Sequence, residues 1–388
     1  MVAGAIVYYI IDALPLEAQE EDMLYHIITR YVQPALLFSM LFLSFLRVSI
    51  HDLKPHRWHG ILLAVQGGFF IICSLAACGI DLLAAADTTA TAMQHAGQLA
   101  SSSIAAAADT TATAMQAGSQ LASSNIAAET GTDWHGIKII MEGAMLCFIC
   151  PTATASAVIV RKLGGSLSGI VTYILLVNML VAILAPAFLP LVEPHGGMNF
   201  ITEFTLIIGK VFPLLLCPLL LAMIVRSYAP AFTDRLLQYS DLPFYLWLIA
   251  LPLAITVTVR TIYNSHVSVG ILLGMCLVSL VCCILQFWLG RKIGSRWLQP
   301  TKDPSEWKRA TYDPATYVDA VERSAITAGQ AFGQKNTVFV IWLGLMFLNP
   351  ITSVVGGCYS IWHNIINAWQ LHEKAKRDAM IANQLPIE

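Results

Sequence analysis

Charged side chains are scarce in this 388-residue chain, in which aspartate, glutamate, lysine and arginine together make up 12% of the residues. A typical soluble domain contains about 25% of these residues. Hydrophobic residues account for 57% of the chain, and the charged residues stand in short islands between long apolar runs. Because a run of about 20 apolar residues spans a bilayer as a helix, the composition excludes a soluble globular domain and predicts a polytopic membrane protein.

The chain also lacks the common signatures of catalysis. It contains no HExxH, no GxSxG and no aspartate-rich metal motif at the ends of its apolar segments. We therefore expect that the protein is not an enzyme and that it has no nucleic-acid partner. A membrane sensor that does not transport anything remains an alternative, although no soluble signalling domain follows the last apolar run.

Apolar runs divide the chain into spanning segments. Nine of them are long enough to cross a bilayer, some with interruptions, and they lie at 32–47, 60–86, 136–160, 166–191, 201–226, 243–262, 267–290, 324–348 and 350–371. An apolar segment at 1–15 precedes them and lacks the basic start and the cleavage site of a signal peptide. We interpret it as a short first helix. The sequence thus predicts a single all-α domain over 1–388 with ten transmembrane helices.

Lysine and arginine are concentrated in alternate loops, which are the loops after predicted helices 2, 4, 6 and 8. They are Arg47, Lys54, Arg57, Arg161, Lys162, Arg226, Arg235, Arg291, Lys292, Arg296, Lys302, Lys308 and Arg309. The loop at 17–22, the segment 84–133 and the loop at 193–203 contain no lysine or arginine. Since basic loops stay inside the cell, we predict a multi-pass protein of the bacterial inner membrane with both termini, the loop 297–320 and the tail 372–388 in the cytoplasm.

A tandem repeat of 22 residues interrupts the apolar pattern. Residues 84–105 read AAADTTATAMQHAGQLASSSIA, and residues 106–127 read AAADTTATAMQAGSQLASSNIA. The loop pattern places 84–127 outside the cell, between predicted helices 3 and 4. Alanine favours helix, whereas the lack of a continuous apolar stripe favours partial disorder. A helical hairpin, one extended helix and a partly disordered insertion therefore all remain open.

Two predicted helices contain polar interruptions at membrane depth, CPTATAS at 150–156 in helix 4 and AGQAFGQKNT at 328–337 in helix 9. Irregular backbone in a membrane is tolerated only inside protein or beside a watery cavity. Helices 4 and 9 hold the same place in two halves of five, and because five is odd the second half is inverted. Interrupted helices at matching places in two inverted repeats indicate a transporter binding site near the midplane. A proline kink alone explains the first interruption equally well, whereas Lys335 in the second is costly in a membrane.

Several motifs together resemble one family. They are CPTATASAV at 150–158, SLSGIVTYILL at 166–176, GQKNTVFVIW at 333–342, SIWHNIINAW at 360–369 and, more weakly, LLAVQGGFF at 62–70. In order and spacing they resemble the bile acid:sodium symporter family, particularly its bacterial members. The resemblance implies a panel of helices 1, 2, 6 and 7 beside a core of helices 3–5 and 8–10, in which helices 4 and 9 are broken and cross. It also implies coupling of two sodium ions to the uptake of an organic anion.

The resemblance assigns roles to particular residues. It places Thr154, Asn336, His363 and Asn364 in the substrate cavity. It places Ser156, Ser168 and Thr172 at one sodium site, as the metal ligands, and Gln66 near the other. Each of these residues, considered alone, also has a simpler structural interpretation. Ser168 and Thr172 are one turn apart and could bond backbone carbonyls within their own helix, and His363 could be a core histidine.

The sequence departs from the family pattern where a glutamate of helix 9 normally serves both sodium ions. If the segment aligns without a gap, Ala331 replaces that glutamate and Lys335 replaces the glutamine that follows it in the family. If Lys335 is an insertion, Gln330 and Gln334 take these two places instead. No carboxylate lies between 325 and 340. We therefore expect Lys335, with Gln334 and Gln66, to alter the coupling, because an ammonium group could replace a sodium ion.

Three possibilities for the coupling of transport to an ion stay open at this stage. Transport is either independent of sodium, or coupled to protons, or still coupled to sodium that binds weakly at Ser156, Ser168 and Thr172 while Lys335 snorkels to a polar cavity. Glu142, in predicted helix 4, could pair with Lys335, relay protons or face the outer vestibule. The sequence predicts no bound cofactor, with Na+ as the only ion under consideration.

The function predicted from these patterns is secondary active transport of a small organic anion by alternating access, in contact with the lipid bilayer. The polar groups of Thr154, Asn336 and His363 suit a carboxylate. Neither the identity of the substrate nor the oligomeric state follows from the sequence.

Overall fold

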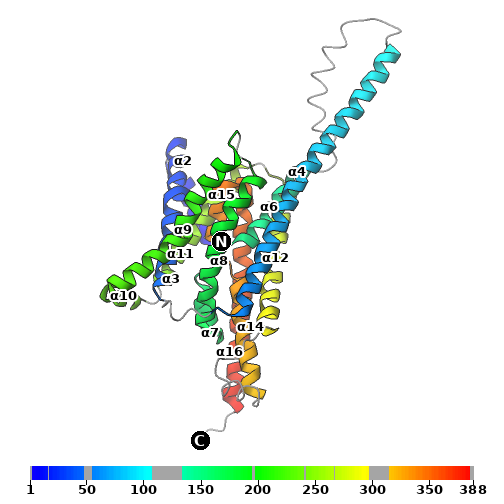
Figure 1. Ribbon diagram of the computed structural model, residues 1–388. Coiled ribbons are helices and arrows are strands. Elements are labelled where there is room, and N and C mark those ends of the chain that lie inside the picture. The colour runs from blue at the N-terminus through cyan, green and yellow to red at the C-terminus, as the bar shows by residue number, and fades with distance from the viewer. Residues whose placement is uncertain are drawn as a thin grey trace.

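The fold is all-α over the residues that the computed structural model describes, which are 2–15, 17–47, 55–106, 133–194, 197–239, 242–265, 267–296 and 314–384 (Figure 1). Six helical stretches are long and apolar enough to cross a membrane. They are Ala18–Leu46, Arg57–Gln94, Leu167–Val192, Phe200–Tyr228, Tyr245–Asn264 and Val269–Arg296. The prediction of an α-helical, multi-pass membrane protein is confirmed at this level.

The helices that contain these stretches follow the predicted apolar runs. They are α2 (Ala18–Ile27), the π-turn η1 (Ile28–Val32), α3 (Gln33–Leu46), α4 (Arg57–Ala106), α8 (Leu167–Val192), α9 (Phe200–Tyr228), α11 (Leu242–Asn264) and α12 (Val269–Arg296). Helices α2, η1 and α3 form one continuous run that bends through the π-turn.

The remaining helices are shorter or more polar. They are α1 (Val2–Asp12), α6 (Trp134–Ile149), α7 (Ser156–Leu163), α10 (Pro230–Leu237), α14 (Pro314–Gly333), α15 (Thr337–Phe347), the 3-10 turn η3 (Pro350–Ser353) and α16 (Val354–Gln384). Both predicted interruptions are present, because α6 stops before Pro151 and α14 stops before Gln334. None of the four helices that flank the two breaks is among the six stretches that could cross a membrane.

Three segments predicted as loops are helical instead. Residues 18–22 of the acidic segment 17–22 start α2, where Glu17 and Glu20 form a capping box and Glu21 pairs with Arg260 at 3.1 Å. Helix α14 already begins at Pro314, inside the predicted loop 297–320, whose residues 297–313 lie outside the described residues. The predicted tail 372–388 continues α16 as far as Gln384. In each case local helix propensity and capping extend the helix beyond its apolar part.

The first repeat copy extends α4 beyond the bundle, as the cyan end of this helix shows in Figure 1. Residues 84–105 are helical, which fits both a helical hairpin and one extended helix, and the second copy lies outside the described residues except for Ala106. The indole Nε1 of Trp134 donates to Asp87 Oδ2 at 2.9 Å, so the start of the repeat is held against α6. The rest projects away from the other helices.

The helices pack in two groups. Helices α1, α3, α9 and α11 contact one another, while α4, α6, α8, α12, α14 and α16 form a second set of contacts. Helices α8 and α9 join the two groups. Helices α12 and α14 approach each other closely, because a Cβ atom added to Gly290 would lie 2.5 Å from the Ala328 carbonyl oxygen. Only glycine allows the two backbones to meet at this point.

Candidate functional site

The two helix breaks lie against each other in the second group of helices. The Ala153 N–H donates to the Gln334 carbonyl at 2.9 Å, and the Asn336 N–H donates to the Pro151 carbonyl at 2.9 Å. These two bonds form an antiparallel bridge between Thr152 and Lys335. Four broken helix ends therefore meet at one point, which we call the crossing (residues 150–156 and 333–337).

Side chains from other helices cap the carbonyl groups that the breaks leave free. The amide of Gln66 donates to the Cys150 carbonyl at 3.1 Å, and that of Gln286 donates to the Cys147 carbonyl at 3.2 Å. The Tyr359 hydroxyl donates to the Gly333 carbonyl at 2.8 Å. Unpaired helix ends are costly in an apolar interior. These polar residues therefore stabilise the breaks, which explains their presence in apolar helices.

Hydroxyl and thiol groups of the first break complete this network. Thr152 donates to the Ala331 carbonyl at 2.5 Å, and the Cys150 thiol donates to the Asn336 carbonyl at 3.1 Å. Both residues are fully buried. Residues of one break thus satisfy the backbone of the other, and the two cannot be rearranged independently.

Lys335 occupies the centre of the crossing, and its side chain is 1% exposed. Its ammonium Nζ lies 3.3 Å from Gln66 Oε1, which also accepts from the Tyr173 hydroxyl at 3.0 Å, and 4.9 Å from the centre of the Phe332 ring. Within the described residues no carboxylate forms an ion pair with it. The cation is therefore held by an amide oxygen and an aromatic face, and the lysine does not snorkel to an exposed surface.

Glu142 does not pair with Lys335. It lies in α6, and its Oε1 is 3.8 Å from the Nζ of Lys138, one turn earlier in the same helix. Of the alternatives for Glu142, pairing with Lys335 is therefore wrong. An i,i+4 lysine on its own helix is the nearer partner.

The predicted sodium ligands use their hydroxyl groups locally. Ser156 donates to the Ala153 carbonyl at 2.6 Å, and Thr172 donates to the Ser168 carbonyl at 2.8 Å, one turn back in α8. The second bond is the within-helix alternative that the sequence left open. Ser168 itself is half-buried. Hydroxyl groups that act as donors keep oxygen lone pairs for a cation, but a buried lysine and the lack of a carboxylate in the crossing do not fit two sodium ions.

The predicted substrate residues divide into two sets. Thr154 is half-buried and precedes Ala155, the N-cap residue of α7, and Asn336 caps α15 by accepting from the Phe339 N–H at 3.3 Å, so these two lie within the crossing. His363 is buried with its ring edge-on to Tyr359, and no partner of its Nδ1 is found among the described residues. Asn364 is exposed, and its amide donates to the Ser360 carbonyl at 2.7 Å. The structure thus brings Thr154 and Asn336 together and turns Asn364 away.

Three further polar residues were missed as parts of the crossing. Tyr173 lies within the motif 166–176, which was chosen for other residues, and Tyr359 directly precedes the motif 360–369. Gln286 stands alone in an otherwise apolar stretch of α12. An isolated glutamine in a spanning helix is a sequence signal that could have identified it, because such a residue needs a partner in the membrane. Gln334, beside Lys335, is buried, and its Oε1 has no partner among the described residues.

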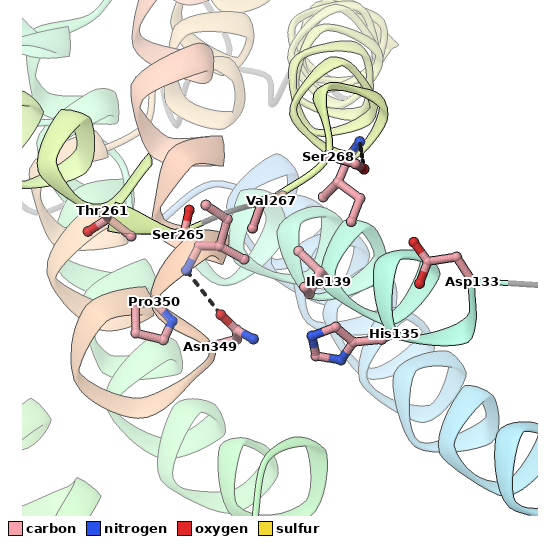
Figure 2. A pocket seen from close by; sticks show the side chains of 11 residues that line it. Asp133, His135, Ile139, Thr261, Ser265, Val267, Ser268, Asn349 and Pro350 are labelled. Atoms are coloured by element: carbon pink, nitrogen blue, oxygen red, sulfur yellow. Dashed lines mark hydrogen bonds between the residues drawn. The ribbon is translucent and has the colours of Figure 1, made fainter. Parts of the chain in front are cut away.

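A pocket of about 440 Å³ lies at some distance along the chain from all these residues (Figure 2). It is lined by the start of α6, the end of α11, the start of α12 and the turn η3: Asp133, His135, Ile139, Thr261, Ser265, Val267, Ser268, Ile271, Asn349, Pro350 and Ile351. Asp133 and Asn349 cap helices here, since they accept from the N–H groups of Gly136 at 2.9 Å and Ile351 at 3.2 Å. None of the predicted site residues lines it. The pocket separates α11, of the first group of helices, from α6 and α12 of the second.

Comparison with known proteins adds no identification. No protein-family model matches the chain, and no curated protein is similar to it. Among the described residues, no cluster of three or more histidine, cysteine or acidic side chains could hold a metal ion. The site is thus defined by the geometry of the crossing alone.

Proposed function

We propose that the protein is a secondary active transporter of small organic anions that works by alternating access, as the resemblance to the bile acid:sodium symporter family implies. The observation that carries this proposal is the crossing of two broken helices inside an apolar helical bundle. Backbone irregularity at such depth is costly and is associated with substrate sites in transporters. A structural bundle or a sensor has no need of paired breaks.

The proposed topology is ten spanning segments in two inverted repeats. The order α1, α2–α3, α4, α6–α7 and α8 matches the order α9, α11, α12, α14–α15 and α16, and the broken segment is fourth in each half. The first group of helices (α1, α3, α9 and α11) corresponds to the panel, and the second group corresponds to the core. The packing supports this division. The helices assigned to the panel contact one another, and so do the helices assigned to the core.

The proposed orientation has both termini in the cytoplasm of a bacterial cell. Basic residues occupy the last turns of α7, α9, α10 and α12. In Figure 1, α7, α10 and the far end of α16 lie toward the end of the bundle opposite to the projecting end of α4. The basic end is inside according to the positive-inside rule.

The proposed substrate is an anion because the crossing offers hydrogen-bond donors and positive helix ends. Helix α7 begins at Ser156 without a side-chain cap, since its N-cap residue is Ala155, which follows the half-buried Thr154. Helix α15 begins next to Asn336. The N-terminal ends of helices favour anions. Thr154 and Asn336 would bind a carboxylate there, with His363 nearby and Asn364 outside the site.

The proposed coupling differs from sodium symport. The Lys335 side chain places a positive charge at the centre of the crossing when it is protonated, and its Nζ donates to Gln66 there. Ser156 and Thr172 donate their hydroxyl protons to backbone carbonyls. A sodium ion placed beside Lys335 would meet like charge in a medium of low dielectric constant. Sodium-coupled transport with weak sodium sites is the alternative outcome of the test below.

The test begins with purified protein and a set of small carboxylates, screened for those that raise its melting temperature. Radiolabelled forms of the stabilising compounds are then offered to proteoliposomes. We expect accumulation of at least one compound, and we expect Asn336→Ala to lower its uptake by roughly 10-fold or more while the exposed Asn364→Ala leaves it nearly unchanged. Absence of uptake for every stabilising compound would reject transport.

A further inference from the structure

A second group of charged side chains lies outside the crossing, and we call it the Lys138 cluster (Asp81, Lys138, Glu142 and Glu193). It joins α4, α6 and the residue that follows α8. Three of its members are partly exposed, with side-chain exposures of 48% for Asp81, 15% for Lys138 and 35% for Glu193. Glu142 is 1% exposed. The cluster therefore reaches from the surface into the interior of the bundle and ends at Glu142.

The only lysine of the cluster binds the two outer carboxylates rather than the buried one. Its Nζ is 2.9 Å from Glu193 Oε2 and 3.0 Å from Asp81 Oδ2, but 3.8 Å from Glu142 Oε1. The last distance is too long for a hydrogen bond. The other oxygen of Glu142, Oε2, has no donor among the described residues. An ionised carboxylate buried in this way would be poorly stabilised.

A proton bound to one of the two carboxyl groups, Glu142 or Glu193, removes the repulsion between them. The carboxyl groups of Glu142 and Glu193 both face the Lys138 ammonium group, with one oxygen of each at 3.8 Å and 2.9 Å from its Nζ. Two ionised carboxylates are both acceptors and repel each other, so a bond between them requires that one carries a proton. Since Lys138 already donates to Glu193, the proton belongs on Glu142, which then donates to Glu193.

The other elements that pack on α6 supply no competing charge at this level. Gly143 touches Met275 of α12 and Val355 of α16, which are apolar. Helix α15 and the turn η3 contain no charged residue, and α8 has none before Glu193. The other titratable groups on the apolar parts of α4, α12 and α16 are Cys73, Cys78, Cys276, Cys282, Cys283, Cys358, Tyr359 and His363. Cys78 donates to the Leu191 carbonyl, Tyr359 donates to the Gly333 carbonyl, and His363 packs against the Tyr359 ring.

We propose that Glu142 and Glu193 form a proton-binding site, in which one proton from water is held on Glu142 and shared with the carboxylate of Glu193. Binding of the proton lowers the cluster from two net negative charges to one. The partly exposed Asp81 and Glu193 give the proton its path to solvent. If the proposed function is correct, this proton is a coupling ion separate from Lys335, and that role alone rests on the proposed function.

The experiment is an infrared pH titration of the purified protein in lipid, in ordinary and in heavy water. We expect a carbonyl band of a protonated buried carboxyl group that shifts in heavy water, and we expect Glu142→Gln to remove it. Glu203→Gln is the matched control, because Glu203 is a second buried carboxylate, 3% exposed, on α9. The band should survive in that variant. A spectrum that Glu142→Gln leaves unchanged would overturn the proposal.

A conservative variant keeps the test valid if Glu142→Gln does not fold. Glu142→Asp retains a carboxyl group, so the band should move in frequency rather than vanish. Glu193→Gln replaces the acceptor of the shared proton and should also shift the band. A band that is identical in Glu193→Gln and in the unchanged protein would contradict the sharing. The titration requires no substrate, so a failure of the proposed transport function would leave its result intact.

Discussion

Lys335 and Gln66 together determine the chemistry of the crossing. The glutamine binds three partners at once, since its amide donates to Cys150 while its oxygen accepts from Lys335 and Tyr173. A buried lysine without a carboxylate is unusual because the charged form loses its hydration. Gln66 and the Phe332 ring replace part of that hydration. The residue pair is therefore both a structural link between α4 and the second break and the feature that separates this site from a sodium site.

Replacing Gln66 by leucine should destabilise the protein strongly. The substitution keeps the approximate volume but leaves a carbonyl, a hydroxyl and an ammonium group without their partner, and each buried unpaired group costs about 1–3 kcal/mol. We predict a loss of about 3 kcal/mol or more, measured by thermal unfolding in detergent. The exposed Gln238 is the matched control, and Gln238→Leu should change stability by less than about 0.5 kcal/mol. Equal effects of the two substitutions would show that Gln66 is not a structural link.

Replacing Lys335 by glutamate should create a sodium response. The substitution supplies the carboxylate that the crossing lacks, with the oxygen of Gln66 beside it. We predict that the melting temperature of the unchanged protein is the same in sodium chloride and choline chloride, whereas that of Lys335→Glu rises in sodium. Sodium at ten times its dissociation constant would add about 1.4 kcal/mol. Lys335→Met, which removes the charge only, should not respond. A sodium response of the unchanged protein would speak against the lysine interpretation.

At the scale of elements, the sequence predicted both breaks because polar residues and a proline interrupt apolar runs there. It also predicted most spanning helices for the same reason. It did not predict the start of α2, and it left open whether the repeat is helical. Helices of this kind depend on local capping and on single contacts such as Glu21 with Arg260 and Trp134 with Asp87. These contacts join residues far apart in the chain, and periodicity in one segment does not reveal them.

The site was predictable only in part, for a related reason. The motifs placed Thr154, Asn336 and Lys335 at the breaks. The capping of the break by Gln286 and Tyr359, and the outward position of Asn364, follow from how α12 and α16 are rotated in the bundle. That rotation is set by packing, such as the contact of Trp362 with Ser279 of α12. A sequence motif that names two neighbouring residues cannot show that one faces inward and the other outward.

The close packing of α12 on α14 should be sensitive to one methyl group. A Cβ atom at Gly290 would lie 2.5 Å from a backbone oxygen and 2.9 Å from the Gly329 Cα, so the helices would have to separate. We predict that Gly290→Ala lowers stability by about 1–3 kcal/mol, measured as a fall in melting temperature. Gly209→Ala on α9 is the matched control, since nothing lies within 4 Å of its Cβ position. It should be neutral or slightly stabilising. A larger fall in melting temperature for Gly209→Ala than for Gly290→Ala would show that the α12–α14 contact is not tight.

At the scale of the whole molecule, the first copy of the repeat extends one helix of the bundle away from the crossing. Its beginning is attached to α6 through Asp87 and Trp134. We predict that deleting the second copy, residues 106–127, which is one complete period, leaves melting temperature and uptake unchanged. A deletion that also removes Asp87 should lower stability by about 1 kcal/mol, because Trp134 loses its acceptor. Loss of uptake on removal of the second copy alone would show that the repeat takes part in transport.

The arrangement of two helix groups around a crossing gives the molecule its proposed mode of action. The pocket of Figure 2 lies between α11 of the first group and α6 and α12 of the second. In the proposed transporter it is the outer end of the cleft between panel and core. Movement of one group against the other would open the crossing to either side, with Thr154 and Asn336 as the fixed binding residues.

The central claim is that this crossing transports an organic anion with a lysine in the place of a sodium ion. Uptake of a stabilising organic anion into proteoliposomes, with sodium replaced by choline, tests it most directly. The account predicts that uptake by the unchanged protein is undiminished in choline. Uptake that requires sodium would contradict the claim, and it would return Ser156, Ser168 and Thr172 to the role of sodium ligands.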